Sequence, residues 1–198
     1  MSPAWPPSAR IVWASLIAVA LATAAVLAYL SIPAGDRSDR VAPGAFVLRL
    51  HDEPRQLAEV AFMDDQGRAR TLRQFRDKLL LVNLWATWCA PCREEMPALD
   101  RLQRELGGAD FEVLALSIDS GGAAAVKRFY DEMNIRSLAI YVDSTMRATG
   151  AFGAMGIPTT LLVDAEGREI GRRTGPAQWD GPDAVRIIKA YLEQKAKS

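Results

Sequence analysis

The chain has 198 residues, of which 49% are hydrophobic and 24% charged, and its formal net charge is zero. These values are typical of one globular domain with an appendage, and the lack of a clustered basic run in the sequence argues against nucleic acid as a partner. Two cysteines and one histidine exclude a scaffold of several disulfides, and they are too few for a four-ligand zinc site without carboxylates or a second chain.

Residues 11–30 form an uncharged apolar segment near the amino terminus. A helix of this length spans about 30 Å, which matches the hydrocarbon core of a bilayer. Arg10 is the nearest basic residue, and the acidic and basic residues between Asp36 and Arg40 cancel. The positive-inside rule therefore keeps residues 1–10 in the cytoplasm. We expect a single-pass anchor in the inner (cytoplasmic) membrane, with the carboxyl-terminal domain in the periplasm.

A cleaved signal peptide is the alternative interpretation of the same segment. The small residues of Ala20–Ala22 and Ala22–Ala24 resemble cleavage sites, but they lie inside the apolar run. The run is also longer than the roughly 7–15 residues of a signal core. We therefore favour a retained anchor over a soluble periplasmic protein. Either interpretation places the rest of the chain in an oxidising compartment.

Turn-forming and polar residues in 31–44 indicate a linker, so the folded domain is expected over residues 45–198. At the start of this domain, Phe46–Leu50 is expected to be a short strand or an extended lead-in. The polar segment His51–Arg55 is expected to be a loop.

The rest of the domain alternates between expected strands and helices. Leu79–Trp85 is an apolar run interrupted only by Asn83, which is typical of a strand buried on both faces. Pro91–Leu106 carries apolar residues at helical spacing and is followed by Gly107 and Gly108. The other expected elements, in chain order, are a hairpin over residues 60–71, a helical turn at Leu72–Phe75, a strand at Phe111–Ile118, a helix at Ala123–Met133, a strand at Ser137–Val142, a short helix at Ser144–Phe152, a hairpin of Thr159–Val163 and Glu169–Thr174, and a helix at Asp183–Gln194. This order predicts an α/β domain with a mixed sheet.

Cys89 and Cys92 are the only cysteines, and they lie where the expected strand gives way to a helix. Free N–H groups and the helix dipole at such a junction favour a thiolate at Cys89, which predicts a lowered pKa and an attacking sulfur. Cys92 is then expected to resolve the mixed disulfide, and Pro91 is tolerated because helix starts need no N–H there. A purely structural disulfide is the alternative, but so short a loop adds little stability by closure entropy.

Gly156, Ile157 and Pro158 precede another expected strand. A proline at that position is a candidate for a cis peptide, which would aim the backbone of Ile157 at an incoming peptide. The alternative is an ordinary trans proline in a loop.

Further residues are candidates for the same site. Glu95 lies three residues after Cys92 and could exchange protons with the thiols, although a solvated surface glutamate fits the spacing equally well. Trp88 is expected at an apolar rim where a partner docks, and Trp85 in the core. His51 is expected at the surface rather than as a ligand, and Met155 is expected to pack rather than to bind copper.

The chain resembles the thioredoxin-like superfamily, and most closely the TlpA-like, membrane-anchored periplasmic thioredoxin-like proteins and the related cytochrome c maturation reductases. The runs that carry this resemblance are Leu81–Leu99, Phe111–Val113 and Gly175–Trp179, and it extends from about Ala42 to the carboxyl terminus. The resemblance implies a thioredoxin fold, in which helices flank a central mixed sheet, behind an N-terminal transmembrane helix. Asn83 departs from ordinary thioredoxins, which have an aspartate there. The lone Thr-x-x-Cys of peroxiredoxins is absent from the sequence.

The resemblance also implies which residues act. Cys89 is the nucleophile, Cys92 the resolving cysteine and Pro158 a cis-proline, and Glu95 matches the Cys-x-x-Cys-x-x-Glu acid of the cytochrome-maturation relatives. The residues expected to contact a substrate are Trp88, Ala90, Pro91 and Ile157. No cofactor is expected beyond the redox-active Cys89–Cys92 disulfide.

The predicted function is reduction of protein disulfides by an anchored periplasmic thiol:disulfide oxidoreductase. The resemblance implies clients in the copper-centre assembly of cytochrome oxidase and a membrane electron donor of the DsbD/CcdA type. Reduction of apocytochrome c cysteines is the alternative client. A Cu(I)-binding module that uses the two thiolates, and a redox-inert docking module, are the rivals from other classes.

Overall fold

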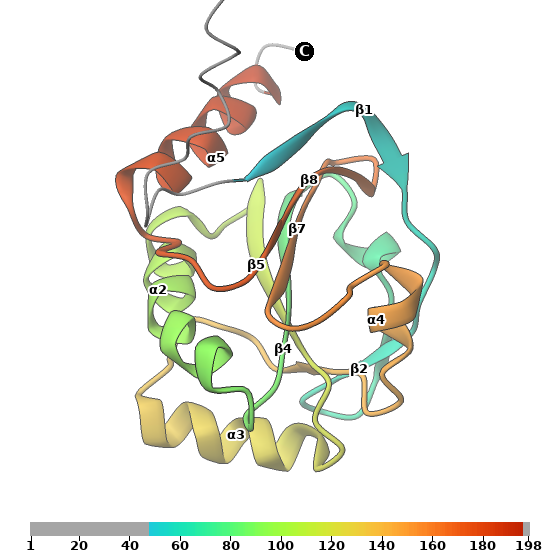
Figure 1. Ribbon diagram of the computed structural model, residues 1–198, viewed down its shortest axis with the longest axis vertical. Helices are drawn as coiled ribbons and strands as arrows, with labels where there is room; N and C mark the ends of the chain where they lie inside the picture. The colour runs from blue at the N-terminus through green and yellow to red at the C-terminus, as the bar shows by residue number, and fades with distance from the viewer. Residues whose placement is uncertain (1–47, 196–198) are drawn as a thin grey trace, which may run out of the picture. The chain divides into compact units, whose positions relative to one another are not determined.

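The computed structural model describes residues 48–195, which lie within one compact unit and contain a mixed sheet of eight strands (Figure 1). Across the sheet the strands follow the order β1 (Arg49–Gln56), β8 (Arg168–Thr174), β7 (Thr159–Val163), β4 (Leu79–Trp85), β5 (Phe111–Ser117), β6 (Tyr141–Val142), β2 (Phe62–Asp64) and β3 (Ala69–Arg70). Strands β4, β5 and β6 run parallel, and the other neighbours are antiparallel.

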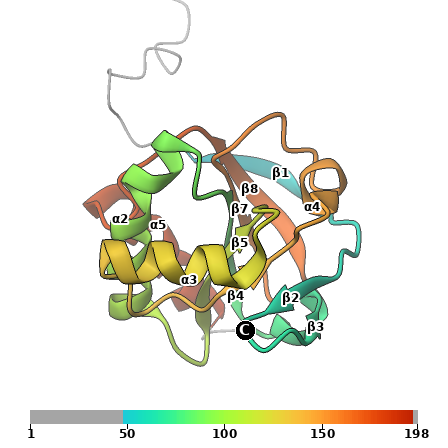
Figure 2. The ribbon, with the colours of Figure 1, turned by 90° about the horizontal axis from the view of Figure 1, so that it is seen from below.

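Helices cover both faces of the sheet, as Figures 1 and 2 show. Residues of α2 (Ala90–Leu106), α3 (Gly122–Met133) and α5 (Pro182–Lys195) share one buried cluster with the sheet. Residues of α4 (Arg147–Ala151) and of the 3₁₀ turn η2 (Leu72–Phe75) belong to a second cluster on the opposite face. Because both faces are covered, the central strands are apolar on both sides.

Strand β4 fixes where the dithiol lies. All seven of its residues are buried, and β5 and β7 flank it. After Trp85 the chain turns sharply, and Cys89 is the N-cap of α2. The parallel neighbour β5 ends at the same edge, where the N–H of Ile118 donates to the carbonyl of Trp85 at 2.9 Å. The dithiol therefore lies at the carboxyl ends of two central parallel strands, a usual place for sites in α/β sheets.

The predicted α/β architecture with a mixed sheet is confirmed, as are the helices expected after the dithiol and at the end of the domain. The loop expected at His51–Arg55 is wrong, because these residues belong to β1, which pairs with β8 across an irregular register. The strand expected at Ser137–Val142 is reduced to Tyr141–Val142. Its first residues do not pair because the N–H groups of Ser137 and Leu138 donate to the carboxylate of Asp100.

The segments expected as a cytoplasmic end (1–10), an anchor (11–30) and a linker (31–44) lie outside the described residues. Within residues 48–195, none of the helices combines the length and the apolar character needed to cross a bilayer.

Candidate redox site

Cys89 and Cys92 form a disulfide at the first turn of α2, with their Cα atoms 5.3 Å apart. The N–H of Cys92 points at Cys89 Sγ, at 3.3 Å. Cys92 is fully buried, whereas the neighbouring Ala90 and Pro91 are exposed. A backbone donor and a helix N-terminus beside Cys89 Sγ stabilise a thiolate there once the disulfide is reduced.

A second segment approaches Cys89 from the other side. We call residues 153–158 the proline loop; they connect α4 to β7. The carbonyl oxygen of Ile157 lies 3.8 Å from Cys89 Sγ, and the Ile157–Pro158 bond is cis, as predicted. Residues at the start of β7 and just after β8 hold the loop: Thr159 Oγ1 donates to the carbonyl of Gly156, and the N–H of Gly175 donates to that of Pro158.

Glu95 lies one helical turn beyond Cys92 and is only 3% exposed, so the interpretation as a solvated surface residue is wrong. Its Oε1 accepts a hydrogen bond from Asn83 Nδ2 at 2.8 Å. Its Oε2 accepts from the N–H of Ala177 at 2.9 Å and from Trp179 Nε1 at 3.0 Å. The carboxylate thus joins the dithiol helix to β4 and to the loop before α5.

Burial raises the pKa of Glu95, and the hydrogen bonds from Ala177, Asn83 and Trp179 only partly offset this effect. The charge of Arg173 also favours the ionised form. A carboxyl group with a raised pKa keeps its proton to a higher pH than a free one, which suits it better to proton exchange with a thiol.

Asn83 supplies a polar group inside β4, all of whose residues are buried. Its Nδ2 donates to Glu95 and also to Thr160 Oγ1, at 2.9 Å. Its Oδ1 is buried and has no hydrogen-bond partner among the described residues. If Glu95 becomes protonated and the Asn83 amide rotates, this oxygen can therefore accept a hydrogen bond from the Glu95 carboxyl group.

Trp85 and Trp88 differ in exposure as expected, because Trp85 is buried in the core and Trp88 is 66% exposed. Trp85 stacks on Tyr130, with ring centroids 5.9 Å apart, and also contacts Phe129. The expected packing of Met155 is wrong, because this residue of the proline loop is 98% exposed. Trp88 and Met155 therefore add exposed apolar surface on the two segments that flank Cys89.

Sequence reasoning missed Asp119, a buried carboxylate just after β5. It accepts hydrogen bonds from the N–H of Thr87 at 2.9 Å, from Thr87 Oγ1 at 2.6 Å and from Ser117 Oγ at 2.7 Å. It therefore holds the turn that precedes Trp88 and Cys89. The only available signal was an acidic residue at the carboxyl end of a predicted central strand.

His51 is not the surface residue that was expected. Its ring is largely buried, and Nε2 lies 2.7 Å from Glu169 Oε1. Among the described residues, no group of three or more His, Cys, Asp or Glu side chains could hold a metal ion.

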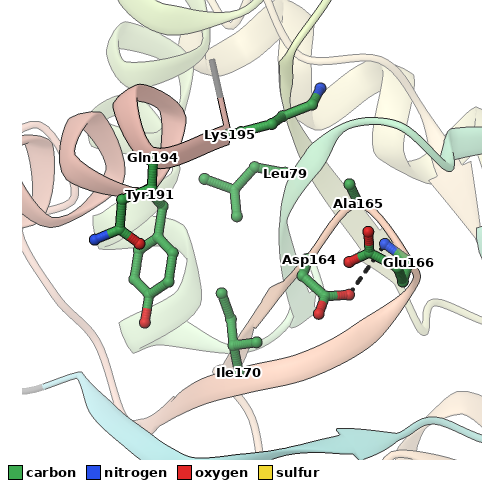
Figure 3. A pocket seen from close by; sticks show the side chains of 8 residues that line it. All are labelled: Leu79, Asp164, Ala165, Glu166, Ile170, Tyr191, Gln194 and Lys195. Atoms are coloured by element: carbon green, nitrogen blue, oxygen red, sulfur yellow. Dashed lines mark hydrogen bonds between the residues drawn. The ribbon is translucent and has the colours of Figure 1, made fainter. Parts of the chain in front are cut away.

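A pocket of about 360 Å³ lies away from the dithiol (Figure 3). Leu79 at the start of β4, Tyr191 and Gln194 of α5 and Glu166 of the β7–β8 turn are among the residues that line it. Because β4 runs from Leu79 to Trp85, this pocket and the dithiol lie at opposite ends of the strand, about 20 Å apart. The pocket is not part of the redox site.

Comparison with known proteins agrees with this geometry. A family model described as AhpC/TSA family matches residues 54–168. The thiol-disulfide oxidoreductase ResA of Bacillus thuringiensis is 29% identical over 112 residues, which cover 57% of this chain and 64% of that protein. The thioredoxin-like protein YneN of Bacillus subtilis is 31% identical over 117 residues, which cover 58% of this chain and 67% of that one.

The crystal structure of a thiol:disulfide interchange protein of the thioredoxin family from Chlorobium tepidum superposes with a TM-score of 0.56 at 25% identity, covering 72% of this chain and 99% of that one. The predicted thioredoxin-like fold is therefore confirmed, and the ResA relative carries the name of the predicted enzyme class. The match spans just under two thirds of the length of the ResA relative.

Proposed function

The chain belongs to the AhpC/TSA family, and on that premise we propose that it is a thiol:disulfide oxidoreductase that reduces disulfide bonds in client proteins. One observation carries the proposal: Cys89 and Cys92 form a disulfide at the N-terminus of α2, with a backbone N–H directed at Cys89 Sγ. A purely structural disulfide is a poor explanation for this pair, because closing a loop of so few residues adds little stability. It would also not explain why the pair lies at a helix N-terminus.

In the proposed reaction the reduced Cys89 attacks one sulfur of the client disulfide as a thiolate. A bond forms between Cys89 Sγ and that sulfur, and the other client sulfur leaves as a thiolate and takes up a proton. Cys92, as a thiolate, then attacks Cys89 Sγ, which re-forms the Cys89–Cys92 disulfide and releases the second client thiolate. Two electrons pass from the dithiol to the client, as in other thiol–disulfide exchanges.

Glu95 is the proposed acceptor of the Cys92 proton. Both side chains are buried, and they lie three residues apart on α2, where helical neighbours face one another. A buried thiol cannot lose its proton to bulk water directly, so a carboxyl group with a raised pKa beside it serves as the local base.

The client is proposed to bind along the two segments that flank Cys89. Trp88, Ala90 and Pro91 are exposed next to the nucleophile, and Ile157 presents its backbone from the proline loop before Pro158. An extended peptide can pair with such a backbone segment while apolar side chains cover the exposed rim.

The cellular setting is proposed from the resemblance in sequence. Residues 11–30 would anchor the protein in the inner membrane, and the domain would act in the periplasm. The clients would be an assembly factor of the copper centre of cytochrome oxidase or, alternatively, apocytochrome c. A membrane protein of the DsbD/CcdA type would restore the dithiol. Membrane fractionation tests the anchor, since a shortened chain in the soluble periplasmic fraction would contradict it.

Trapping of the client tests the central proposal. Cys92→Ala should accumulate as a mixed disulfide with its client through Cys89, because the resolving attack is lost. Cys89→Ala/Cys92→Ala is the matched control and should trap nothing. Equal recovery of disulfide-linked partners with both variants would refute the assigned roles. Mass spectrometry of the trapped partner distinguishes the two client classes.

The direction of electron flow needs a separate measurement. Potentials in this fold range from about −270 mV for reductants to about −120 mV for the oxidant DsbA. We expect a value in the reducing half of this range from equilibration with glutathione. A potential as high as that of DsbA would contradict a reductant. Stoichiometric Cu(I) binding by the dithiol without any turnover of disulfides would favour the metal-binding rival.

A further inference from the structure

A largely buried polar cluster lies on the face of the sheet that α4 covers; its arginine side chain keeps 25% of its surface exposed. Ile170 is skipped in the pairing of β7 with β8, so that Leu162 pairs with Gly171 and Val163 with Glu169. This irregularity places Glu169 and Arg172 on the same side of β8. We call Glu169, Arg172 and His51 the arginine cluster.

The carboxylate of Glu169 is fully engaged inside this cluster. Its Oε1 accepts from Arg172 Nε at 2.6 Å and lies 2.7 Å from His51 Nε2, and its Oε2 accepts from Arg172 Nη2 at 2.7 Å. Burial by itself raises the pKa of Glu169, but the hydrogen bonds from Arg172 and His51 lower it further than burial raises it. Glu169 is therefore ionised at neutral pH, and it fixes the plane of the guanidinium group.

The other edge of the same guanidinium group holds the start of the proline loop. Arg172 Nη2 donates to the carbonyl oxygen of Phe152 at 2.9 Å, and Nη1 donates to that of Gly153 at 3.2 Å. Phe152 is the C-cap of α4, and Gly153 has a φ of +61°, so the chain changes direction there. These carbonyl groups are among those that a helix end leaves without intrahelical partners, and a cation suits them.

From Gly153 the chain needs only four residues to reach Ile157, whose carbonyl oxygen lies 3.8 Å from Cys89 Sγ. Between these points, Ala154 is partly buried and Met155 and Gly156 are exposed, so the apolar packing of this stretch is slight. The loop is therefore held by hydrogen bonds near its two ends. At the start, Arg172 binds two carbonyl oxygens, and the N–H groups of Gly153 and Ala154 donate to carbonyl oxygens of α4. At the finish, Thr159 and Gly175 donate to the loop.

We propose that Arg172 is a positioning residue for the redox reaction. Held by Glu169, which His51 binds in turn, it sets the place of the proline loop and so the distance between the Ile157 backbone and the Cys89 sulfur. The inference rests on the proposed function, in which the client pairs with this loop. It assigns no contact between Arg172 and the client.

The role depends on the shape of the guanidinium group as well as on its charge. One planar group bonds both oxygens of a carboxylate and two successive carbonyl oxygens. A lysine ammonium is a point charge with three donors and cannot reproduce this fork. Arg172→Lys therefore keeps the charge but loses the position of the loop, and it should resemble Arg172→Gln.

The test compares two disulfide probes on the purified full-length protein after reduction. The first is dithiobis-nitrobenzoate, a small aromatic disulfide that reacts with Cys89 without pairing to the loop. The second is a short synthetic peptide with an internal disulfide, which has to lie along the loop. Arg168→Gln is the matched control, because Arg168 lies on the same strand and binds Asp164 and Glu166 at the β7–β8 turn.

With Arg172→Gln and Arg172→Lys, the second-order rate constant for the peptide should fall about tenfold or more, because a misplacement of about 1 Å can cost a hundredfold. The rate constant for the attack of Cys89 on the aromatic disulfide should stay within about twofold of the wild type, because Cys89 and its helix are untouched. Amide resonances of the proline loop should shift, and those of residues 86–88 should not. Arg168→Gln should match the wild type with both probes.

Several outcomes overturn the inference. A peptide rate equal to that of the wild type in Arg172→Gln, or an equal fall in Arg168→Gln, would show that Arg172 has no special role. Should Arg172→Gln fail to fold, the double variant Glu169→Leu/Arg172→Leu removes both charges together and is subject to the same comparison. A wild-type protein that reacts with neither probe would refute the proposed function itself, which is a different result.

Discussion

The role of Glu95 can be tested by comparing Glu95→Gln with Glu95→Ala. Glutamine keeps an oxygen that can face the N–H of Ala177 and Trp179 Nε1. Its amide NH₂ would then face Asn83, whose Oδ1 has no partner among the described residues and can accept once the Asn83 amide rotates. Glutamine thus mimics the protonated acid, whereas alanine removes the acceptor.

Glu95→Ala should be less stable than Glu95→Gln, because it removes the acceptor of buried hydrogen bonds that glutamine keeps. Loss of the acceptor of a buried donor costs about 1–3 kcal/mol, and Glu95→Ala takes this acceptor from two donors that face Oε2. Relief of the buried charge offsets part of this cost. We expect Glu95→Ala to lower the free energy of unfolding by about 2–4 kcal/mol, and Glu95→Gln by less than about 1 kcal/mol.

The kinetic effect should fall on one step only. Under the proposed mechanism, dithiobis-nitrobenzoate should react with the reduced protein in two phases: the attack by Cys89, and then the attack by Cys92 on Cys89 Sγ, which releases the thionitrobenzoate held there. In Glu95→Gln the second phase should slow about a hundredfold near neutral pH, the usual size of a general-base contribution, while the first phase stays within about twofold. In the wild type, the second phase should decline as the pH falls through the raised pKa of Glu95.

Stopped-flow absorbance of the released nitrobenzoate thiolate measures both phases. The control is a stability measurement by urea, which shows that Glu95→Gln is folded at the assay temperature. A second phase in Glu95→Gln as fast as in the wild type would refute the assignment of Glu95 as the base for Cys92. Equal slowing of both phases would also refute it, since that result indicates a disturbed helix N-terminus instead.

Three further predictions concern the surroundings of the dithiol. Asp119→Ala removes the acceptor for Thr87 and Ser117, so thermal unfolding should show that the free energy of unfolding falls by about 2–4 kcal/mol. Asp119→Asn keeps one acceptor oxygen and should lose less. Equal losses in the two variants would contradict the role of these hydrogen bonds. Trp88→Ala should leave stability within about 0.5 kcal/mol because the side chain is exposed, yet weaken peptide docking about fivefold in the rate titration, and unchanged docking would exclude Trp88 from the rim. Because burial raises the folded-state pKa of Glu95 above its ordinary 4.5, the folded protein holds this proton more tightly than the unfolded chain, so the associated stability is greatest below pH 4.5 and is lost as the pH rises through the raised value. Glu95→Gln should abolish this part of the pH dependence of urea unfolding, and an unchanged profile would show that another group causes it.

Local patterns predicted most of the elements, because their periodicity reflects burial directly. The apolar run of β4 and the helical spacing in α2 are examples, and both lie where the sequence indicated. The two hairpins also have a local cause. Asp64 and Asp164 each accept the backbone N–H groups of the residues two and four positions later and pair with the arginine of the same turn, which closes it.

The remaining features depend on contacts that no local pattern encodes. Strand β1 is mostly polar, and it is a strand because it pairs with β8. The sequence could not distinguish Glu95 as a site residue from a surface residue, because its partners Ala177 and Trp179 are more than eighty positions away. Arg172 gave no signal, because its function depends on a skipped pairing residue and on carbonyl groups of a distant turn.

Buried carboxylates share one arrangement around the dithiol. Asp119 holds the turn before Cys89, Glu95 holds the loop before α5, and Glu169 holds the proline loop through Arg172. Apolar packing alone does not satisfy these segments, because each also directs backbone N–H or C=O groups at the interior, beside apolar side chains such as Trp179. A buried charge costs free energy unless it is fully hydrogen-bonded, and it then admits few alternative geometries. A dithiol that must meet a client sulfur in line needs fixed geometry more than it needs stability. On this argument, the amide replacements Glu95→Gln and Asp119→Asn should lower the rate of client reduction, expressed as an activation free energy, by more than they lower the free energy of unfolding.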